Sequence, residues 1–287
     1  MSETKLHIAR TVTALRAQIA GWRGAGERVA LVPTMGALHE GHRALIHRAR
    51  DVAPRVCVSL FVNPTQFAAH EDLETYPRTD DQDRDMLVAE GVDLLYAPTR
   101  EEMYPEGEIT RVTMPGMGDC LEGEHRPGFF TGVATVVSKL LIQATPYVAL
   151  FGEKDFQQLQ IIRRMVTDLS IPVEIEAVPT VREGDGLALS SRNVYLTDNE
   201  RATAPALYRA LRNIRDYLHD GGTAQDVMDR EVAQLTTAGF ASVDYLSVCD
   251  SETFAPVDDI ASLGGRAGRV LGAAQLGPAR LIDNISL

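Results

Sequence analysis

The stretch that most restricts the fold of this chain is residues 28–50, RVALVPTMGALHEGHRALIHRAR. After its arginine it continues with Val, Ala, Leu and Val without a polar residue, which is typical of a strand buried on both faces of a parallel sheet. Pro33 ends the strand, and Gly36 and Gly41 allow a tight loop before an apolar helical pattern begins near Glu40. This order predicts an α/β fold with a Rossmann-like, doubly wound parallel sheet.

Two histidines stand where this helix is expected to begin. His39 and His42 are three residues apart, so both side chains should lie over the first turn and point the same way. That end of a helix carries unpaired N–H groups and the positive end of the dipole, which suit a phosphate. A histidine pair of this spacing is also compatible with a metal site or with two surface histidines. The strand before it, the glycines within it and the helix after it favour a nucleotide triphosphate.

The residues from Pro33 to His42, PTMGALHEGH, resemble the signature of the pantothenate synthetases (pantoate–β-alanine ligases), members of the HxGH nucleotidyltransferase superfamily. The resemblance implies a C–N ligase that condenses pantoate with β-alanine to give pantothenate, AMP and pyrophosphate through pantoyl adenylate. ATP and Mg²⁺ are the implied cofactors, with no metal ligand assigned, and a homodimer is the implied assembly. The implied nucleotide contacts are Met35, Gly36, Ala37, Leu38, His39, Glu40, Gly41 and His42, of which His39 and His42 are also expected to be catalytic.

A second motif, FVNPTQF at residues 61–67, follows a predicted strand at 55–62. The amide of Gln66 offers both a donor and an acceptor, which suits a substrate with a hydroxyl beside a carboxylate. A glutamine in a loop is more often simply solvated. Because the motif is similar to one in the same family, the resemblance implies that Gln66 binds pantoate.

A third motif, FGEKDFQQL, repeats the strand, glycine turn and helix of the first, with a strand predicted at 147–151 and a helix at 156–169. A lysine between strand and helix can reach phosphate oxygens and offset charge that develops there. A lysine at a helix start is usually a surface residue. The family resemblance implies a catalytic Lys154, pantoate binding by Gln158, and nucleotide contacts from Gly152, Glu153 and Asp155.

The segment from Thr180 to Asn193, TVREGDGLALSSRN, combines two serine hydroxyls with a guanidinium, a set that grips triphosphate oxygens. Serine pairs in loops mostly form turns. The segment resembles the family's counterpart of the KMSKS loop of class I tRNA synthetases, which closes on ATP. It implies a catalytic Arg192 and nucleotide contacts from Val181, Leu189, Ser190, Ser191 and Arg192.

One stretch matches the family only in part. LEGEHRPGFFTG has Phe129 where the family usually has histidine after RPG, and His125 does not replace it by position. The segment YPRT, residues 76–79, also matches. Thr79 to Gln82 has the pattern of a capping box, and the aspartates that follow Thr79 predict mainly a solvated, helix-starting face, with a magnesium ligand among them as the alternative. These are Asp80, Asp81, Asp83 and Asp85.

Composition limits the remaining classes of function. A formal net charge of −12 argues against a protein that binds the nucleic-acid backbone. The three cysteines are far apart and form no zinc or redox pattern, which favours reduced thiols in the cytoplasm. Residues 1–10 lack the apolar core of a signal peptide, and no window approaches 18 consecutive apolar residues, so we expect no membrane partner.

Two domains are expected. Residues 1–180 should form the Rossmann-like domain that binds the nucleotide and pantoate, and residues 181–287 a smaller α+β domain that acts as a lid. Further elements predicted for the first domain are helices at 4–23, 79–90 and 133–144 and strands at 92–97 and 173–178. Those predicted for the second are helices at 198–219 and 223–238 and strands at 243–248, 269–274 and 280–282.

Two other functions remain open at this point. Another adenylyltransferase of the superfamily would need extra basic residues for a phosphorylated acceptor, and the two glutamines do not provide them. A catalytically silent nucleotide-binding or scaffold protein would not need every phosphate-seeking side chain. Exchange of labelled pyrophosphate into ATP that depends on pantoate would separate the ligase from the silent protein.

Overall fold

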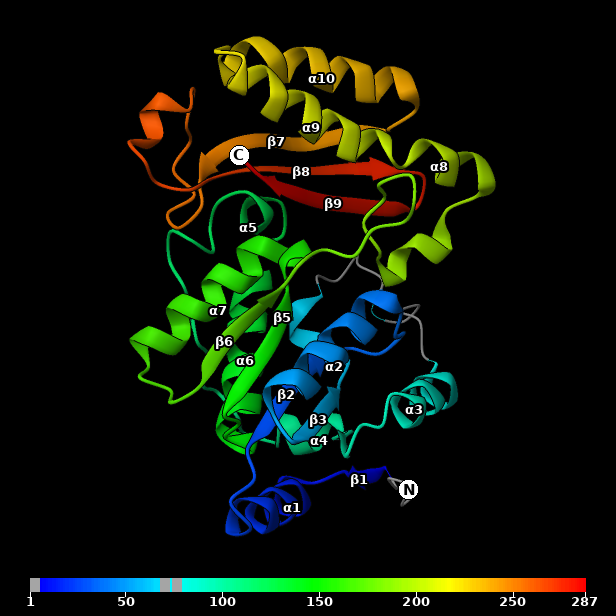
Figure 1. Cartoon of the computed structure of the whole chain (residues 1–287), viewed down its shortest axis with the longest axis vertical. Coiled ribbons are helices and arrows are strands. Elements are labelled where there is room, and N and C mark those ends of the chain that lie inside the picture. The colour runs from blue at the N-terminus through cyan, green and yellow to red at the C-terminus, as the bar shows by residue number, and fades with distance from the viewer. Residues whose placement is uncertain (1–5, 68–72, 74–78) are drawn as a thin grey trace. The chain divides into compact units, whose positions relative to one another are not determined.

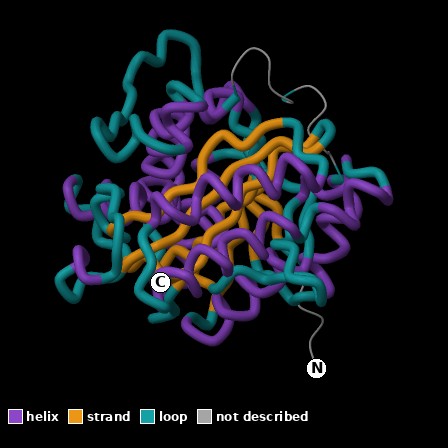
Figure 2. Tube along the Cα trace, turned by 90° about the horizontal axis from the view of Figure 1, so that it is seen from above, coloured by secondary structure: helices purple, strands orange, loops and turns teal. Residues whose placement is uncertain are grey.

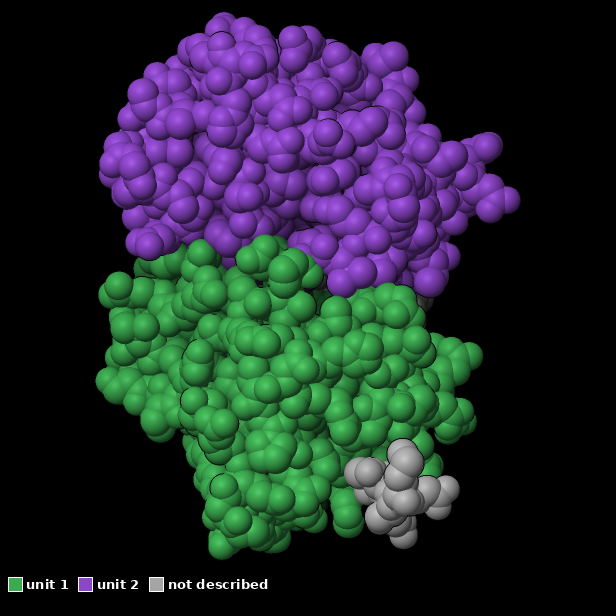
Figure 3. All heavy atoms as spheres, viewed as in Figure 1, with its two compact units in different colours: residues 1–119, 126–153, 157–179 green, residues 120–125, 154–156, 180–287 purple. Residues whose placement is uncertain are grey.

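The computed structural model describes residues 6–67, 73 and 79–287 (Figure 1). Contacts within the chain divide it into two compact units, coloured separately in Figure 3. Unit 1 comprises residues 1–119, 126–153 and 157–179, and unit 2 comprises residues 120–125, 154–156 and 180–287. Two short segments from the middle of the chain, residues 120–125 and 154–156, therefore pack with the C-terminal part.

Unit 1 is built on a six-stranded sheet in the order β1-β4-β3-β2-β5-β6, with every pairing parallel. This architecture confirms the predicted α/β class and the doubly wound parallel sheet. The strands are β1 (His7–Ala9), β2 (Val29–Thr34), β3 (Arg55–Leu60), β4 (Leu94–Tyr96), β5 (Val148–Gly152) and β6 (Glu174–Val178).

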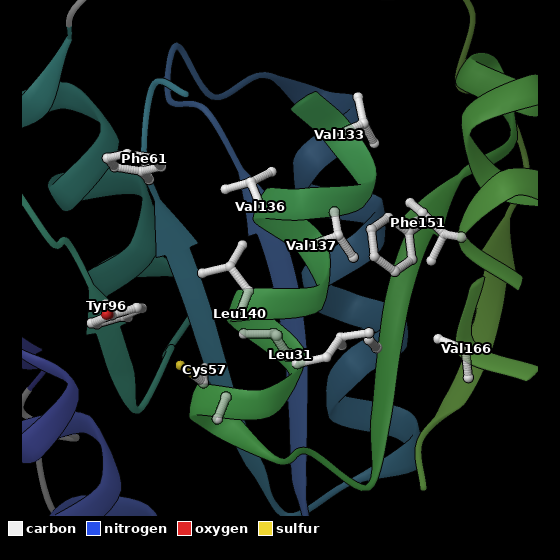
Figure 4. Packing of buried hydrophobic residues seen from close by; sticks show 14 of the residues in the cluster. Leu31, Cys57, Phe61, Tyr96, Val133, Val136, Val137, Leu140, Phe151 and Val166 are labelled. Carbon is white, nitrogen blue, oxygen red and sulfur yellow. The ribbon is translucent and has the colours of Figure 1, made fainter. Parts of the chain in front are cut away.

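Helices cover both faces of this sheet because its central strands are apolar at nearly every position. In β2, Leu31 packs into a cluster with residues of α1, α6 and α7, whereas Val32 packs into another with residues of α2 and α3. Figure 4 shows Val136, Val137 and Leu140 of α6 in the first cluster. The helices are α1 (Val12–Gly24), α2 (Glu40–Val52), α3 (Asp80–Ala89), α4 (Arg100–Met103), α6 (Phe129–Ala144) and α7 (Phe156–Asp168).

The N-terminal segment differs from the prediction of one helix over residues 4–23. β1 pairs with β4, and α1 begins only at Val12, after Thr11, whose side chain accepts a hydrogen bond from the N–H of Ala14. A three-residue strand is too short to show a period in the sequence. α6 also starts earlier than predicted, directly after Gly128, whose φ of 84° is accessible to glycine at little cost.

Unit 2 contains a three-stranded antiparallel sheet in the order β7-β8-β9, with helices packed on it, which confirms the predicted smaller α+β part. The predicted helix at 198–219 is broken, because Pro205 has no N–H to donate. The elements are α8 (Asp198–Thr203), α9 (Ala206–His219), α10 (Ala224–Ala238), β7 (Ser242–Asp250), β8 (Gly268–Leu276) and β9 (Ala279–Ser286). Figure 2 shows strands in orange among the purple helices.

Unit 2 also holds a short helix from the middle of the sequence, α5 (Glu122–His125). Arg280 Nη1 donates to both carboxylate oxygens of Glu122, at 2.7 and 2.8 Å, and Arg280 Nε donates to Asp244 at 2.6 Å. Burial of the Tyr245 side chain, and to a smaller extent the nearby charge of Glu122, raises the pKa of the Tyr245 hydroxyl. Glu122 is only 5% exposed, so the ion pair fastens this segment within unit 2.

Candidate active site

The predicted site loops of unit 1 begin at the carboxyl ends of neighbouring strands. β2 lies between β3 and β5 in the sheet, and the chain winds outward from β2 to β3 on one side and to β5 and β6 on the other. Open parallel sheets bind their ligands where the winding reverses in this way. The loop after β2 carries the histidine pair, the turn after β3 carries Gln66, and the turn after β5 leads to Lys154.

The two histidines form the cap of α2. His39 is the N-cap residue, and its Nδ1 accepts from the N–H of Gly41 at 3.1 Å. His42 Nδ1 accepts in turn from the N–H of His39 at 3.2 Å, and the ring centroids are 4.2 Å apart. Since Nδ1 acts as the acceptor in both rings, each neutral imidazole carries its proton on Nε2. The pair can therefore present two Nε2–H donors at the positive end of a helix.

The backbone of this loop is held by a carboxylate that the sequence analysis had placed in solvent. Asp83 is 2% exposed; its Oδ2 accepts from the N–H of Ala37 at 2.9 Å and its Oδ1 from the N–H of Leu38 at 2.8 Å. Gly36 and Ala37 have positive φ angles of 91° and 50°, so this support fixes an otherwise unfavourable conformation. The prediction of a solvated Asp83 is wrong, because the carboxylate neutralises two loop donors.

The capping box predicted for α3 does not form. Thr79 makes no side-chain hydrogen bond to the helix N-terminus, and its hydroxyl donates instead to Asp83 Oδ1 at 3.0 Å. A hydrogen bond from the Thr79 hydroxyl to the Asp83 carboxylate is stronger than one between two neutral groups, such as a cap bond to a backbone N–H. The neighbouring family match, Tyr76-Pro77-Arg78, lies outside the described residues.

Gln66 is buried at the end of a 3₁₀ turn, Pro64–Gln66, and its amide oxygen accepts from Asn63 Nδ2 at 2.8 Å. Asn63 is itself fixed by the hydroxyl of Tyr104, which donates to its Oδ1 at 2.8 Å. With its oxygen held in this way, Gln66 is oriented to donate through its NH₂ group. The sequence motif drew attention only to Gln66, so the support from Asn63 was missed.

Phe129, which stands where the family resemblance implies a histidine, has an identifiable partner. The guanidinium of Arg126 lies 3.7 Å from the centre of the Phe129 ring. Arg126 Nη2 also donates to the backbone oxygen of Gln66 at 3.0 Å. The phenyl ring therefore supports, through a cation–π contact, an arginine that braces the glutamine turn.

The turn after β5 is shared between the two units. Gly152 and Glu153 belong to unit 1, as does the half-buried Gln158, whereas Lys154 and Asp155 belong to unit 2. Lys154 lies in a 3₁₀ turn, Glu153–Asp155, and its Nζ is 3.8 Å from Asp155 Oδ1. Its side chain is only 19% exposed, so much of its length is held within the protein rather than extended into solvent.

The remaining predicted nucleotide contacts form one segment of unit 2. Leu189 N–H donates to the Val181 oxygen at 3.0 Å, which closes a hairpin that leads directly into Ser190. Ser190 is the N-cap of a 3₁₀ helix, Ser191–Tyr195, and its hydroxyl accepts from the N–H of Arg192 at 3.3 Å. Two hydroxyls and a guanidinium therefore share one ordered turn, an arrangement that can bind phosphate oxygens.

The predicted site residues thus fall into two groups, one in each unit. Unit 1 brings together the histidine cap and the Gln66 turn at neighbouring strand ends, and unit 2 carries Lys154 and the Ser190–Arg192 turn. Within the described part of the chain, no three His, Cys, Asp or Glu side chains gather as a metal site would require. Over the same residues, no helix has the length and apolar character needed to span a bilayer.

Comparisons with known proteins agree over nearly the whole chain. Residues 7–286 match the family model for pantoate-beta-alanine ligase. A pantothenate synthetase from Paramagnetospirillum magneticum is 54% identical over 284 residues, covering 99% of each chain.

Two solved structures are also similar. The crystal structure of pantothenate synthetase from Thermus thermophilus has a TM-score of 0.89 and 48% identity and covers 97% of this chain and 98% of its own. The pantoate-beta-alanine ligase from Francisella tularensis, complexed with beta-gamma ATP and beta-alanine, has a TM-score of 0.83 and 33% identity, with 98% of each chain covered.

Proposed function

The chain belongs to the pantoate–β-alanine ligase family, an enzyme family that forms a C–N bond, and from this premise we propose that it makes pantothenate through a pantoyl adenylate. The histidine cap of α2 is the observation that carries this proposal. Its two Nε2–H groups, fixed by backbone N–H bonds to Nδ1, are preorganised donors for a triphosphate. ATP is the proposed co-substrate, as the ligand of the Francisella tularensis relative suggests.

In the first step, the pantoate carboxylate attacks the α-phosphorus of ATP, the bond to the β-phosphate oxygen breaks, and pyrophosphate leaves. The protein forms no covalent bond; it positions the reactants and stabilises the charge that develops on the phosphates. His39 and His42 donate from unit 1. Lys154, Arg192 and the hydroxyls of Ser190 and Ser191 supply cationic and neutral donors from unit 2.

In the second step, the amine of β-alanine attacks the carbonyl carbon of the adenylate, and AMP leaves with the electron pair of the broken C–O bond. Gln66 and Gln158 hold the pantoyl group, Gln66 through the NH₂ that Asn63 orients. The nitrogen loses a proton as the amide forms. A mixed anhydride is labile to water, so a lid function for unit 2 would protect it.

Mg²⁺ would enter with the nucleotide, where it would neutralise phosphate charge. It is usually bound by substrate phosphates and at most one or two carboxylates, and this agrees with a site lined by imidazole, ammonium and guanidinium groups. By family resemblance we also propose a cytoplasmic homodimer with a role in pantothenate and coenzyme A synthesis.

The test is exchange of labelled pyrophosphate into ATP in the presence of pantoate. The wild-type protein should catalyse it without β-alanine, and His42→Ala and Lys154→Ala should each lower it by about 100-fold or more, the size of effect that removal of one charge-stabilising donor has in other enzymes. His47→Ala is the matched control, since this histidine of α2 has a 64% exposed side chain and pairs with Glu90.

Absence of exchange in a wild-type protein that binds ATP would overturn the adenylate proposal and favour a silent nucleotide-binding protein. Normal exchange in His42→Ala or Lys154→Ala would show that the charge-stabilising role belongs to another group.

A further inference from the structure

Two adjacent residues of β9, Asp283 and Asn284, bind two different segments of unit 2. Asp283 is 6% exposed, and its carboxylate accepts from Arg182 Nη1 at 2.6 Å and from Nη2 at 2.8 Å. Arg182 bridges to Ala188 within the hairpin that precedes Ser190. The bidentate ion pair therefore attaches the hairpin that precedes the Ser190–Arg192 turn to β9.

Asn284 attaches a second segment to the same strand, the 3₁₀ turn Glu153–Asp155 that contains Lys154, called the lysine turn below. It is 3% exposed, and its Nδ2 donates to the backbone oxygen of Lys154 at 2.8 Å. Its Oδ1 accepts from Arg269 Nε at 2.7 Å, so the amide is held in the orientation that directs its NH₂ to Lys154. Both ends of the Asn284 side chain are thus used, and only an amide satisfies both.

Two ring contacts strengthen this attachment. The guanidinium of Arg269 lies 4.1 Å from the centre of the Phe156 ring, and Phe254 meets the same ring edge-on with centroids 6.2 Å apart. Lys154 to Phe156 therefore pack with unit 2, although the residues on either side of them pack with unit 1. Arg182 Nη2 also donates to the Asn284 backbone oxygen at 3.3 Å, which joins the two attachments.

We propose that Asp283 and Asn284 are positioning residues for the adenylation step. They keep Lys154 and the Ser190–Arg192 turn on one rigid strand, so that the ammonium, the hydroxyls and the guanidinium approach a triphosphate as a single preorganised set. Successive residues of a strand point to opposite faces, which is how neighbouring side chains can reach two segments that are far apart in sequence. The inference rests on the proposed function, because it assigns these groups to phosphate.

The variant that tests it is Asn284→Asp. The carboxylate still accepts from Arg269 but places an acceptor against the Lys154 oxygen, so the lysine turn loses its attachment at constant side-chain size. Pantoate-dependent pyrophosphate exchange should fall by about 100-fold in kcat, because a displacement of about 1 Å has effects of that size. The KM for pantoate should stay unchanged, since Gln66 and Gln158 lie in unit 1. Asn199→Asp, on the exposed start of α8, is the matched control and should keep full exchange.

A double-mutant cycle distinguishes positioning from general support of the fold. In a Lys154→Ala background, Asn284→Asp should cause no further loss of exchange, because it acts through the lysine. An equal loss in both backgrounds, or full exchange by Asn284→Asp alone, would overturn the proposal.

Amide hydrogen exchange gives a readout that does not depend on catalysis. Asn284→Asp should increase exchange in a peptide that covers residues 154–156 and not in one that covers 180–192, and Asp283→Asn should do the reverse. Unchanged protection in both peptides would refute the attachments themselves. If protection changes as expected while the wild type shows no pyrophosphate exchange, the proposed function fails and with it the assignment to adenylation.

Discussion

Two strand–turn–helix segments of this molecule look alike in sequence and are supported in opposite ways. The loop from β2 to α2 is held by Asp83, which accepts two backbone N–H groups from residues 46 and 45 positions earlier. The turn from β5 to α7 is held by Asn284, which donates to a backbone oxygen 130 positions earlier. The first loop depends on a carboxylate of its own unit close in sequence. The second depends on the last strand of the chain.

The two kinds of support match the units in which the two segments pack. The histidine loop has two residues at positive φ and stays within unit 1, so an internal anion that binds its N–H groups is enough to keep it in shape. The lysine turn joins β5 to α7, both largely in unit 1, and yet packs with unit 2. Its position is therefore set by side chains outside its own βα unit.

The largest effect is expected from Asp83→Asn, which breaks the support of the first loop. An amide keeps one acceptor but turns its NH₂ toward the other backbone donor. Loss of a charged hydrogen bond with a buried donor left unpaired costs about 2 kcal/mol of the free energy of unfolding, and pyrophosphate exchange should fall by about 100-fold. Urea unfolding and exchange kinetics measure both. Asp85→Asn, exposed on the same helix, is the control, and equal behaviour of the two variants would contradict the role of Asp83.

A smaller effect is expected from Gly41→Ala, which disturbs the histidine cap alone. A Cβ at this position would lie 2.8 Å from His39 Cε1 and 3.0 Å from its Nδ1, so the ring must move. Exchange should fall by about 10-fold, the lower end of the range for a misplaced donor. The free energy of unfolding should change by less than about 1 kcal/mol, because alanine favours the helix while the cap is weakened.

The control for that variant is Gly21→Ala in α1, where an added Cβ meets nothing within 4 Å. It should raise the free energy of unfolding by about 0.5–1 kcal/mol and leave exchange unchanged. Full activity of Gly41→Ala would mean that the position of the His39 ring is not critical.

The smallest effect concerns the distant support of the lysine turn. The N–H of Thr253, the Arg266 guanidinium and the N–H of Glu252 all donate to Asp250 and hold the pKa of its carboxyl well below its usual value. Asp250 thereby fixes the turn that carries Phe254, the residue against Phe156. Asp250→Asn should lower the free energy of unfolding at pH 7 by about 1 kcal/mol.

The pH dependence gives this last prediction its sign. A carboxyl whose pKa is lowered on folding contributes its full stability above its unfolded pKa of about 3.9 and loses it as the pH falls toward the folded value. The difference between wild type and Asp250→Asn should therefore be constant from about pH 5 to 7 and shrink below about pH 4. Asp229→Asn, exposed on α10, should show no such difference, and a gap that persists undiminished at about pH 3 would contradict the assignment.

The elements with a strong hydrophobic period were predictable from the sequence, whereas the side chains that support the site loops from a distance were not. β2 was predictable because each of its residues from Val29 to Val32 is apolar and buried, on one face of the sheet or the other. Pro205, which divides α8 from α9, was readable but was outweighed by the apolar pattern on both sides of it. Asp83 was misread because acidic residues at a helix start are usually solvated.

The candidate site residues stand in recognisable motifs, and the residues that support them do not. Asn63, Arg126 and Asn284 stand in no periodic pattern, and their partners lie elsewhere in the chain. A side chain whose task is one hydrogen bond to a remote backbone leaves no local trace in a single sequence.

The ion pair between Arg280 and Glu122 bears on which fragments of this protein can be expressed by themselves. A gene fragment that encodes only residues 180–287 omits Glu122 and also Lys154–Phe156. It would leave the half-buried Arg280 with Asp244 as one of its two carboxylate partners, and Arg269 and Phe254 without the Phe156 ring. Chimeras that exchange residues 180–287 between relatives should consequently be soluble only when residues 120–125 and 154–156 are exchanged as well.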